Sequence, residues 1–152
     1  MMGARIRCGL TWILAFCVAA CFSLWEPVCA EGRDKSVTIG VSTPMSGPGA
    51  DWGRMHKQGA TLAQEEINAA GGIDGTKLEL IIEDDKGDPK EAATVSKKFT
   101  SDKDVKVVVG LMTTPQAFAV APIYQKANLP AITCGASNPE VPKQGSYIFQ
   151  NV

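Results

Sequence analysis

The sequence predicts an α/β fold in which a mostly parallel β-sheet has helices on both faces. Short runs rich in Val, Ile and Leu alternate along residues 37–152 with longer segments whose apolar residues recur at helical spacing. Signals that start and stop helices separate these segments, in the order β-α-β-α-β-α-β. Such alternation is typical of parallel sheets, because each helix carries the chain back across the sheet before the next strand.

The carboxyl ends of the strands are therefore the places to search for a binding site. Ligands of such sheets bind beyond these ends, near a switch in strand order. The loops that follow the predicted strands are residues 42–52, 83–88, 110–115 and 133–139.

The first thirty residues are predicted to be a secretory signal peptide. Arg5 and Arg7 supply positive charge before the uncharged run TWILAFCVAACFSLW (11–25), and small residues at positions −3 and −1 place cleavage after Ala30. The run is shorter than the roughly 20 residues that a membrane span needs. A lipoprotein-like alternative, with Cys21 as the lipidated residue, remains open. Either route exports the chain.

The first strand is predicted at residues 37–41 and the first helix at about residues 52–70. Helical spacing places one set of residues on a shared apolar face, which we expect to pack on the sheet: Met55, Gly59, Leu62, Ala63, Ile67 and Ala70. The residues expected to lie away from that face are Lys57, Gln64, Glu65 and Asn68. Gly71-Gly72 should end the helix, because glycine adopts a left-handed conformation without a steric penalty.

The second strand and second helix follow a tight turn. Asp74-Gly75 predicts that turn, and residues 78–82 form the strand. Asp88 is expected to cap the helix, with Pro89 in its first position and Glu91 completing a capping box. One face of this helix is predicted to hold Ala92, Val95, Ser96 and Phe99.

A third strand is predicted at residues 105–109, followed by a third helix. Thr114 is expected to cap this helix and Pro115 to open it. The helix should run to Asn128 and be kinked or split at Pro122. Two short strands complete the pattern, at residues 131–133 and 147–149.

Charge and cysteine content exclude some classes of function. The net charge of −1 gives no electrostatic case for binding nucleic acid or an anionic membrane surface. Four of the five cysteines lie in the first thirty residues, so Cys134 stays alone after cleavage and no internal disulfide can form. A lone cysteine is more often a small buried residue than a reactive thiol.

The glycine-rich turn at residues 47–53 does not fit a dinucleotide phosphate. Its glycines are spaced G-x-G-x-x-x-G, whereas the dinucleotide fingerprint is G-x-G-x-x-G. Pro48 lacks an N–H group, and Asp51 brings negative charge to the place where a pyrophosphate would lie. We therefore expect no nucleotide cofactor.

The residues needed for metal binding or catalysis are not gathered in this sequence. His56, the single histidine, is expected to be solvated on the exposed side of the first helix, without a partner at ligand spacing. The acidic residues 83–85 and Asp88 lack calcium-loop spacing and are interpreted as turn and capping residues. One poorly placed histidine cannot build a Ser-His-Asp or Cys-His set. We expect no catalytic residue, no metal site and no enzymatic activity.

Small hydroxyl and backbone groups at the strand ends predict a site for a zwitterion instead. Thr113 and Thr114 lie at a helix N-terminus, where free N–H groups and the helix dipole favour a carboxylate. The Gly135 carbonyl and the Ser137 hydroxyl can accept hydrogen bonds from an ammonium group. Trp52 offers a large apolar face to a ligand side chain.

Four stretches carry a resemblance to a known family: SGPGADWG (46–53), GATLAQEEINAAGGIDGTKLELIIEDDKGDP (59–89), VVVG (107–110) and LPAITCGASNPE (129–140). They resemble the leucine/isoleucine/valine-binding type of periplasmic substrate-binding protein, which serves ABC importers. The resemblance covers nearly all of residues 37–152. Its most specific part is EEINAAGGIDGTKLEL with the DD and DP that follow.

The resemblance implies a non-enzymatic, two-lobed protein that closes on its ligand like a hinge. By position it assigns the ligand carboxylate to Thr114, and the ammonium group to the Gly135 carbonyl and the Ser137 hydroxyl. Trp52 stands where relatives often have an aromatic residue beside the ligand side chain.

The resemblance leaves the ligand itself open. Branched-chain amino acid binders carry a cysteine pair at the positions of Gly87 and Thr113, so that disulfide is absent here. Relatives of this kind take other amino acids, amides, urea or aromatic acids. The implied partner of the full-length form is an inner-membrane ABC permease, and the implied location is the periplasm.

Members of the family are much longer, on the order of 250–300 residues or more for the pair of lobes. We therefore expect residues 31–152 to be a partial N-terminal lobe, in a truncated form of the protein. Two alternatives remain open: a ligand-sensing receptor ectodomain of the same fold, and an exported α/β hydrolase.

Overall fold

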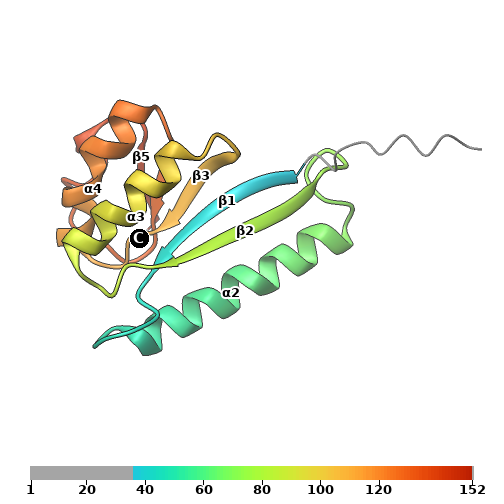
Figure 1. Cartoon of the computed structure of the whole chain (residues 1–152), viewed down its shortest axis with the longest axis horizontal. Coiled ribbons are helices and arrows are strands. Elements are labelled where there is room, and N and C mark those ends of the chain that lie inside the picture. Colours follow the sequence, from blue (N-terminus) through green and yellow to red (C-terminus); the bar gives the residue numbers. More distant parts are fainter. Residues whose placement is uncertain (1–35, 152) are drawn as a thin grey trace, which may run out of the picture. The chain divides into compact units, whose positions relative to one another are not determined.

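The computed structural model describes residues 36–151 and confirms the α/β fold. Five strands and three α-helices alternate along this part of the chain, with one short 3-10 turn near its end (Figure 1). The elements are β1 (Ser36–Thr43), α2 (Ala50–Ala69), β2 (Lys77–Asp84), α3 (Pro89–Ser101), β3 (Val105–Gly110), α4 (Thr114–Ala127), β4 (Ala131–Thr133), η1 (Pro142–Gln144) and β5 (Ile148–Gln150).

The sheet has the strand order β2-β1-β3-β4-β5, and every neighbouring pair is parallel. Val41 in β1 lies beside Ile82 of β2 on one side and Val109 of β3 on the other. Because all strands run the same way, the loops that follow them emerge at one edge of the sheet. The predicted site residues come from these loops and from the first residues of the helices that follow them.

The main hydrophobic core lies between the sheet and the pair α3 and α4 (Figure 1). Phe99, Val108 and Tyr124 are fully buried there. Gly40 makes room for the Phe99 ring, since a β-carbon at residue 40 would stand 3.1 Å from three of its atoms. The predicted α3 face is confirmed, because its members are all buried: Ala92, Val95, Ser96 and Phe99.

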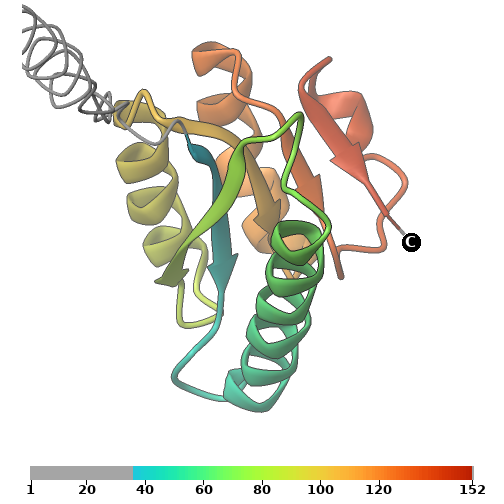
Figure 2. The same cartoon turned by 90° about the vertical axis from the view of Figure 1, so that its right-hand side faces the viewer.

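Helix α2 packs on the other side of the sheet (Figures 1 and 2). The face that it turns inward is not the predicted one. Met55 and Leu62 are exposed, whereas Gln64 and Asn68 are half-buried. The Gln64 and Asn68 side-chain amides each donate to the Leu78 carbonyl over 2.9 Å, and the Leu78 N–H donates to Asn68 Oδ1 over 2.8 Å. Because β2 is an edge strand, the backbone N–H and carbonyl of the buried Leu78 need hydrogen-bond partners from α2. This need, and not the apolar periodicity, decides which face of α2 lies against the sheet.

The turn between α2 and β2 has the predicted form. Gly71 and Gly72 have φ values of 103° and 79°, which end the helix. Asp74 and Gly75 also have positive φ, 51° and 77°. The backbone groups of Ile73 and Thr76, on either side, exchange two hydrogen bonds of 2.8 and 2.9 Å. This is the geometry of a two-residue hairpin turn.

The start of α3 confirms the predicted cap but not the predicted capping box. The Asp88 carboxylate accepts hydrogen bonds from the backbone N–H groups of Lys90 and Glu91. The Asp88 N–H donates to the Asp85 carbonyl, so it is not free for the Glu91 side chain. Glu91 instead pairs with the Lys86 ammonium, 3.2 Å away.

Helix α4 corrects two predictions. Its N-cap is Thr113, not Thr114, and Gln116 completes a capping box with Thr113. The helix is also continuous from Thr114 to Ala127, so of the two effects predicted for Pro122, a kink or a split, the split does not occur. The proline removes one backbone donor, but Val120, Ala121 and Tyr124 are fully buried around it and hold the helix in place.

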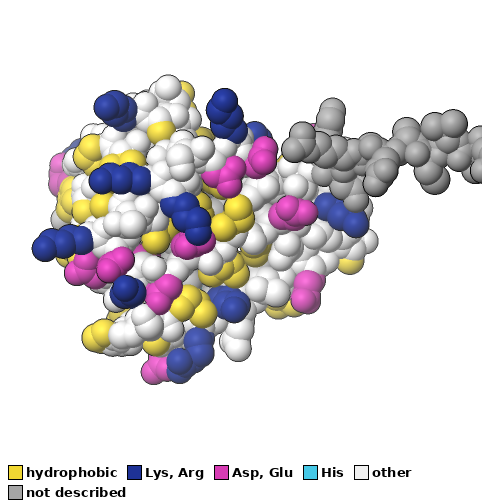
Figure 3. All heavy atoms as spheres, viewed as in Figure 1, with side chains coloured by type: hydrophobic (Ala, Val, Ile, Leu, Met, Phe, Trp, Pro, Cys, Tyr) yellow, Lys and Arg dark blue, Asp and Glu magenta, His cyan; other side chains and the backbone are white. Residues whose placement is uncertain are grey.

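The predicted signal peptide and Cys21 lie outside the described residues and stay predictions. No helix in the described part of the chain has the length and apolar character that crossing a membrane requires. Lysine and arginine side chains lie among aspartate and glutamate side chains on the face shown in Figure 3, so that face carries no continuous patch of one sign.

Candidate functional site

The N-terminus of α4 provides the strongest feature of the predicted site. The Thr113 N–H and hydroxyl both donate to Gln116 Oε1, over 3.1 and 2.9 Å. The Thr113 hydroxyl also accepts from the Gln116 N–H, over 3.5 Å. These bonds use the Thr113 side chain to hold the turn. Within residues 36–151 no hydrogen bond involves the Thr114 side chain, so this half-buried hydroxyl stays available at the positive end of the helix.

The loop after β4 lies directly against the loop after β3. A β-carbon at Gly135 would stand only 2.6 Å from the Met112 carbonyl oxygen, so glycine is needed for this approach. The Cys134 N–H donates to the Gly110 carbonyl over 2.8 Å, which ties the two loops together at their start. Gly135 is exposed and lies two residues beyond the end of β4.

Strand β5 holds the next part of the same loop. The Gln150 side-chain amide donates to the Ala136 carbonyl over 2.6 Å, and Ala136 is fully buried. Ser137 follows directly and is exposed. The Ser137 hydroxyl therefore stands at the surface on a loop whose backbone is fixed from two strands.

Trp52 belongs to another part of this edge, the first turn of α2. Its side chain is 60% exposed. The neighbouring Gly53 is buried against Pro44, where a β-carbon would stand 1.7 Å from the carbonyl oxygen. This contact sets the first turn of α2 on the loop that follows β1.

The structure thus brings some of the predicted residues together more firmly than others. Gly135 touches Met112, which lies two residues before Thr114, the first residue of α4. Within residues 36–151 no hydrogen bond joins the Trp52 side chain to the loop after β3 or to the loop after β4. Two hollows in the described structure lie elsewhere. One, of about 560 Å³, runs along α2 past Arg54 and Leu62, and the other, of about 300 Å³, includes Phe99 and Leu129.

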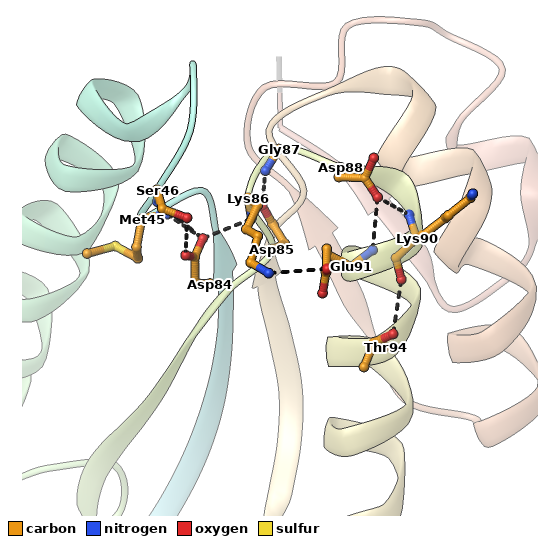
Figure 4. Close-up of polar contacts among 10 residues, drawn as sticks. All are labelled: Met45, Ser46, Asp84, Asp85, Lys86, Gly87, Asp88, Lys90, Glu91 and Thr94. Atoms are coloured by element: carbon orange, nitrogen blue, oxygen red, sulfur yellow. Dashed lines mark hydrogen bonds and ion pairs between the residues drawn. The ribbon is translucent and has the colours of Figure 1, made fainter.

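The loop after β1 is fastened to the end of β2 by Asp84 (Figure 4). Asp84 Oδ1 accepts from the Met45 and Lys86 N–H groups, both over 2.8 Å, and Asp84 Oδ2 accepts from the Ser46 hydroxyl over 2.6 Å. Burial alone would raise the Asp84 pKa, but these hydrogen bonds outweigh burial and lower it.

The acidic cluster is used for structure, as predicted. Asp84 holds a loop, Asp88 caps α3, and Asp85 accepts from the Ser42 hydroxyl over 2.7 Å and from the Gly87 N–H over 3.0 Å. Among residues 36–151, no three His, Cys, Asp or Glu side chains are grouped in a way that could hold a metal ion.

The prediction for His56 was wrong, because its side chain is half-buried rather than solvated. It lies on the inward face of α2, which the sequence periodicity assigned to solvent. Burial lowers the His56 pKa, and the negative charge of Asp85 opposes this effect in part.

Cys134 was expected to be a small buried residue rather than a reactive thiol. It is half-buried beside the carboxyl edge of the sheet. Burial raises its pKa, with an opposing contribution from a hydrogen bond with the Gly110 backbone. Less thiolate is therefore present at neutral pH than for an exposed cysteine.

Two residues of this edge escaped the sequence analysis. Gln116 was not considered, although a threonine three residues before a glutamine is a capping-box signal. Asp84 was considered only as a turn residue. Its bonds to residues about forty positions away could not be found from local pattern.

Comparison with known proteins agrees with this architecture. A family described as periplasmic binding protein matches residues 36–151. The chain is 35% identical over 133 residues to an amino acid binding protein of Pseudomonas aeruginosa, covering 88% of this chain and 34% of that protein. It is 37% identical over 111 residues to the Leu/Ile/Val-binding protein homolog 1 of Brucella abortus, covering 73% and 30%.

Solved structures show the same likeness. The substrate binding protein LivJ of Streptococcus pneumoniae, in complex with isoleucine, superposes with a TM-score of 0.73 at 36% identity, covering 76% of this chain and 33% of that one. A solute binding protein of Rhodopseudomonas palustris in complex with 3,4-dihydroxy benzoic acid gives a TM-score of 0.69 at 26% identity, covering 76% and 31%. The chain thus spans about a third of the length of the proteins that it matches.

Proposed function

The chain belongs to the periplasmic binding protein family, and from this premise we propose that it forms part of the solute-binding component of an ABC importer. Its ligand would be an amino acid, branched-chain or related, or a similar small carboxylate. The protein would work in the periplasm and deliver its ligand to an inner-membrane permease. The family is one of binding proteins, which argues against the exported hydrolase considered above.

One observation supports the proposal: Gly135 lies so close to the Met112 carbonyl that the loop after β4 adjoins the loop after β3. At the end of the loop after β3, the Thr114 hydroxyl and the α4 N-terminus would bind a carboxylate by charge-assisted hydrogen bonds. On the loop after β4, the Gly135 carbonyl and the Ser137 hydroxyl would accept from an ammonium group.

Two solved relatives support the carboxylate as the shared chemistry. One was solved with isoleucine and another with 3,4-dihydroxy benzoic acid, and both ligands contain a carboxyl group. Only the amino acid has an ammonium group. We therefore assign recognition of the shared carboxylate to Thr114. We assign to Ser137 the choice between amino acids and carboxylates that have no ammonium group.

The test is a titration of the 152-residue chain followed by NMR chemical-shift changes, which detect weak binding. Its ligands are leucine and 4-hydroxybenzoate, together with two analogues of leucine. Isocaproate lacks the ammonium group of leucine, and isoamylamine lacks its carboxylate. Thr114→Ala should weaken leucine, isocaproate and 4-hydroxybenzoate by about fivefold, the equivalent of a hydrogen bond of ~1 kcal/mol. Ser137→Ala should weaken leucine but not isocaproate.

Thr94→Ala is the matched control, because this exposed threonine on α3 bonds only to the Lys90 carbonyl of its own helix. It should leave every affinity unchanged. Equal affinities of the Thr114→Ala variant and the unmodified chain for all carboxylates would contradict the proposal. Absence of binding of any of these ligands to the unmodified chain would also contradict it.

A further inference from the structure

We propose that Asp84 is a positioning residue, which fixes the first turn of α2 and so sets Trp52 against the ligand. The proposal rests on the proposed function for its ligand part only. The hydrogen bonds of the Asp84 side chain within residues 36–151 involve neither Trp52 nor the ligand-binding groups assigned above. Asp84 acts through the loop of residues 44–49, which joins β1 to α2.

The first link is the set of hydrogen bonds that the Asp84 carboxylate accepts (Figure 4). Oδ1 bonds to the backbone N–H groups of Met45 and Ser46, over 2.8 and 3.3 Å, and Oδ2 bonds to the Ser46 hydroxyl over 2.6 Å. Oδ1 also accepts the Lys86 N–H over 2.8 Å. One carboxylate thereby joins the loop after β1 to the turn after β2.

The second link is close packing of the same two segments. Gly47 has a φ of +76°, and a β-carbon there would stand 3.3 Å from the Lys86 carbonyl oxygen. The positive φ favours glycine at this position, and the 3.3 Å approach leaves little room for a side chain. The loop therefore rests on the turn that Asp84 itself helps to form.

The third link runs from the loop into α2. Pro44 precedes the residues that Asp84 holds, and its carbonyl oxygen would stand 1.7 Å from a β-carbon at Gly53. Gly53 follows Trp52 directly in the first turns of the helix. The Ala50 N–H also bonds to the Gly47 carbonyl over 3.1 Å, so the helix start cannot move independently of the loop.

The acceptor chemistry suggests a graded set of variants. Asp84→Ala removes every bond from the loop. Asp84→Asn keeps one oxygen for the backbone N–H groups and places its amide against the Ser46 hydroxyl, which can accept as well as donate. Ser46→Ala removes one bond of the set. We expect Asp84→Ala to disturb the position of Trp52 most, and Ser46→Ala and Asp84→Asn to disturb it less.

Asp88→Ala is the control for a purely structural role. Asp88 caps α3 four residues further on, so its loss should destabilise the fold by a comparable mechanism without releasing the β1–α2 loop. A positioning residue and a stabilising residue differ in what they do to Trp52.

The experiment uses the full chain and follows the Trp52 indole N–H resonance, identified by its loss in Trp52→Phe. It also measures leucine affinity and urea unfolding. We expect Asp84→Ala to shift and broaden the indole signal and to weaken leucine at least threefold. Asp84→Asn should retain most of the indole signal and most of the leucine affinity of the unmodified chain. Asp88→Ala should lower the urea midpoint while the indole signal and the affinity stay as in the unmodified chain.

Three outcomes would overturn the proposal. These are an unmoved indole signal in Asp84→Ala, an equal disturbance in Asp88→Ala, and unchanged leucine affinity despite a displaced Trp52. If Asp84→Ala does not fold, Ser46→Ala and Asp84→Asn decide by the same signals. If the unmodified chain binds no carboxylate, the proposed function fails, while the indole signal still decides whether Asp84 positions Trp52.

Discussion

Gly135 lies against the main-chain carbonyl of Met112, so closely that a β-carbon would stand 2.6 Å from its oxygen. This contact joins the loop after β4 to the loop after β3. The two loops carry the groups proposed to bind the two charged ends of a zwitterion. A single methyl group added at Gly135 would collide with the Met112 oxygen, so this contact is the first part of the site to test.

Gly135→Ala should destabilise the fold by about 1–3 kcal/mol, the usual cost of overpacking. The Met112 oxygen belongs to the backbone and cannot move aside as a flexible side chain would. Urea unfolding measures the change. Gly59→Ala is the control, because nothing lies within 4 Å of a β-carbon there and the residue is inside α2. That change should stabilise the chain by up to about 1 kcal/mol. Equal unfolding midpoints of the two variants would contradict the loop contact.

The inward face of α2 can be tested with two substitutions on the same helix. Asn68→Ala should cost about 1–3 kcal/mol, because it leaves the N–H of the buried Leu78 without its partner at the sheet edge. Leu62→Ala should change the free energy of unfolding by no more than about 0.5 kcal/mol, since this leucine is exposed. The opposite ranking in urea unfolding would favour the face that the apolar periodicity predicts.

Asp84 should make stability depend on pH in the acid range. Its folded pKa is below the ordinary value of 3.8, so its contribution is fully present above that pH. The contribution is lost as the pH falls through the folded pKa, because the unfolded chain binds the proton more readily. We expect the stability difference between the unmodified chain and Asp84→Asn to shrink on acidification below this value. A difference that stays constant down to pH ~2 would contradict the lowered pKa.

His56 should produce a separate pH dependence closer to neutrality. Its folded pKa lies below 6.5, because burial disfavours the charged imidazolium. The neutral side chain is accommodated at high pH, and stability decreases as the pH falls below 6.5 towards the folded pKa, since the unfolded chain takes up the proton first. His56→Gln should remove this part of the profile. A profile that is the same in both proteins between pH ~7 and ~5 would contradict the burial of His56.

The order of elements followed from local pattern alone. Apolar runs of strand length identified β1, β2 and β3, and an aspartate before a proline identified the start of α3. These features depend on backbone conformations and on partners within a few residues. The cap of α4 was misplaced by one residue, because the prediction rested on the threonine before Pro115 and not on Gln116, whose spacing of three residues from Thr113 is the capping-box signal.

The orientation of α2 is the clearest failure of pattern. Met55, Leu62 and Ile67 share a helical face, and in most helices such a face is buried. Here the edge strand β2 exposes the backbone of Leu78, and the Asn68 amide satisfies both its donor and its acceptor. Asn68 meets that need and turns the apolar side of the helix outward.

The sequence by itself determined the α/β class, the strand and helix order, and the residue types suited to a carboxylate and an ammonium group. The tertiary structure alone decided which of these residues meet. The apposition of Gly135 and Met112, the bonds from Asp84 to Met45 and Ser46, and the inward face of α2 all join residues distant in the chain. Local pattern reports the conformation of a segment, whereas these contacts depend on how strands pair and on which buried backbone groups still need a partner.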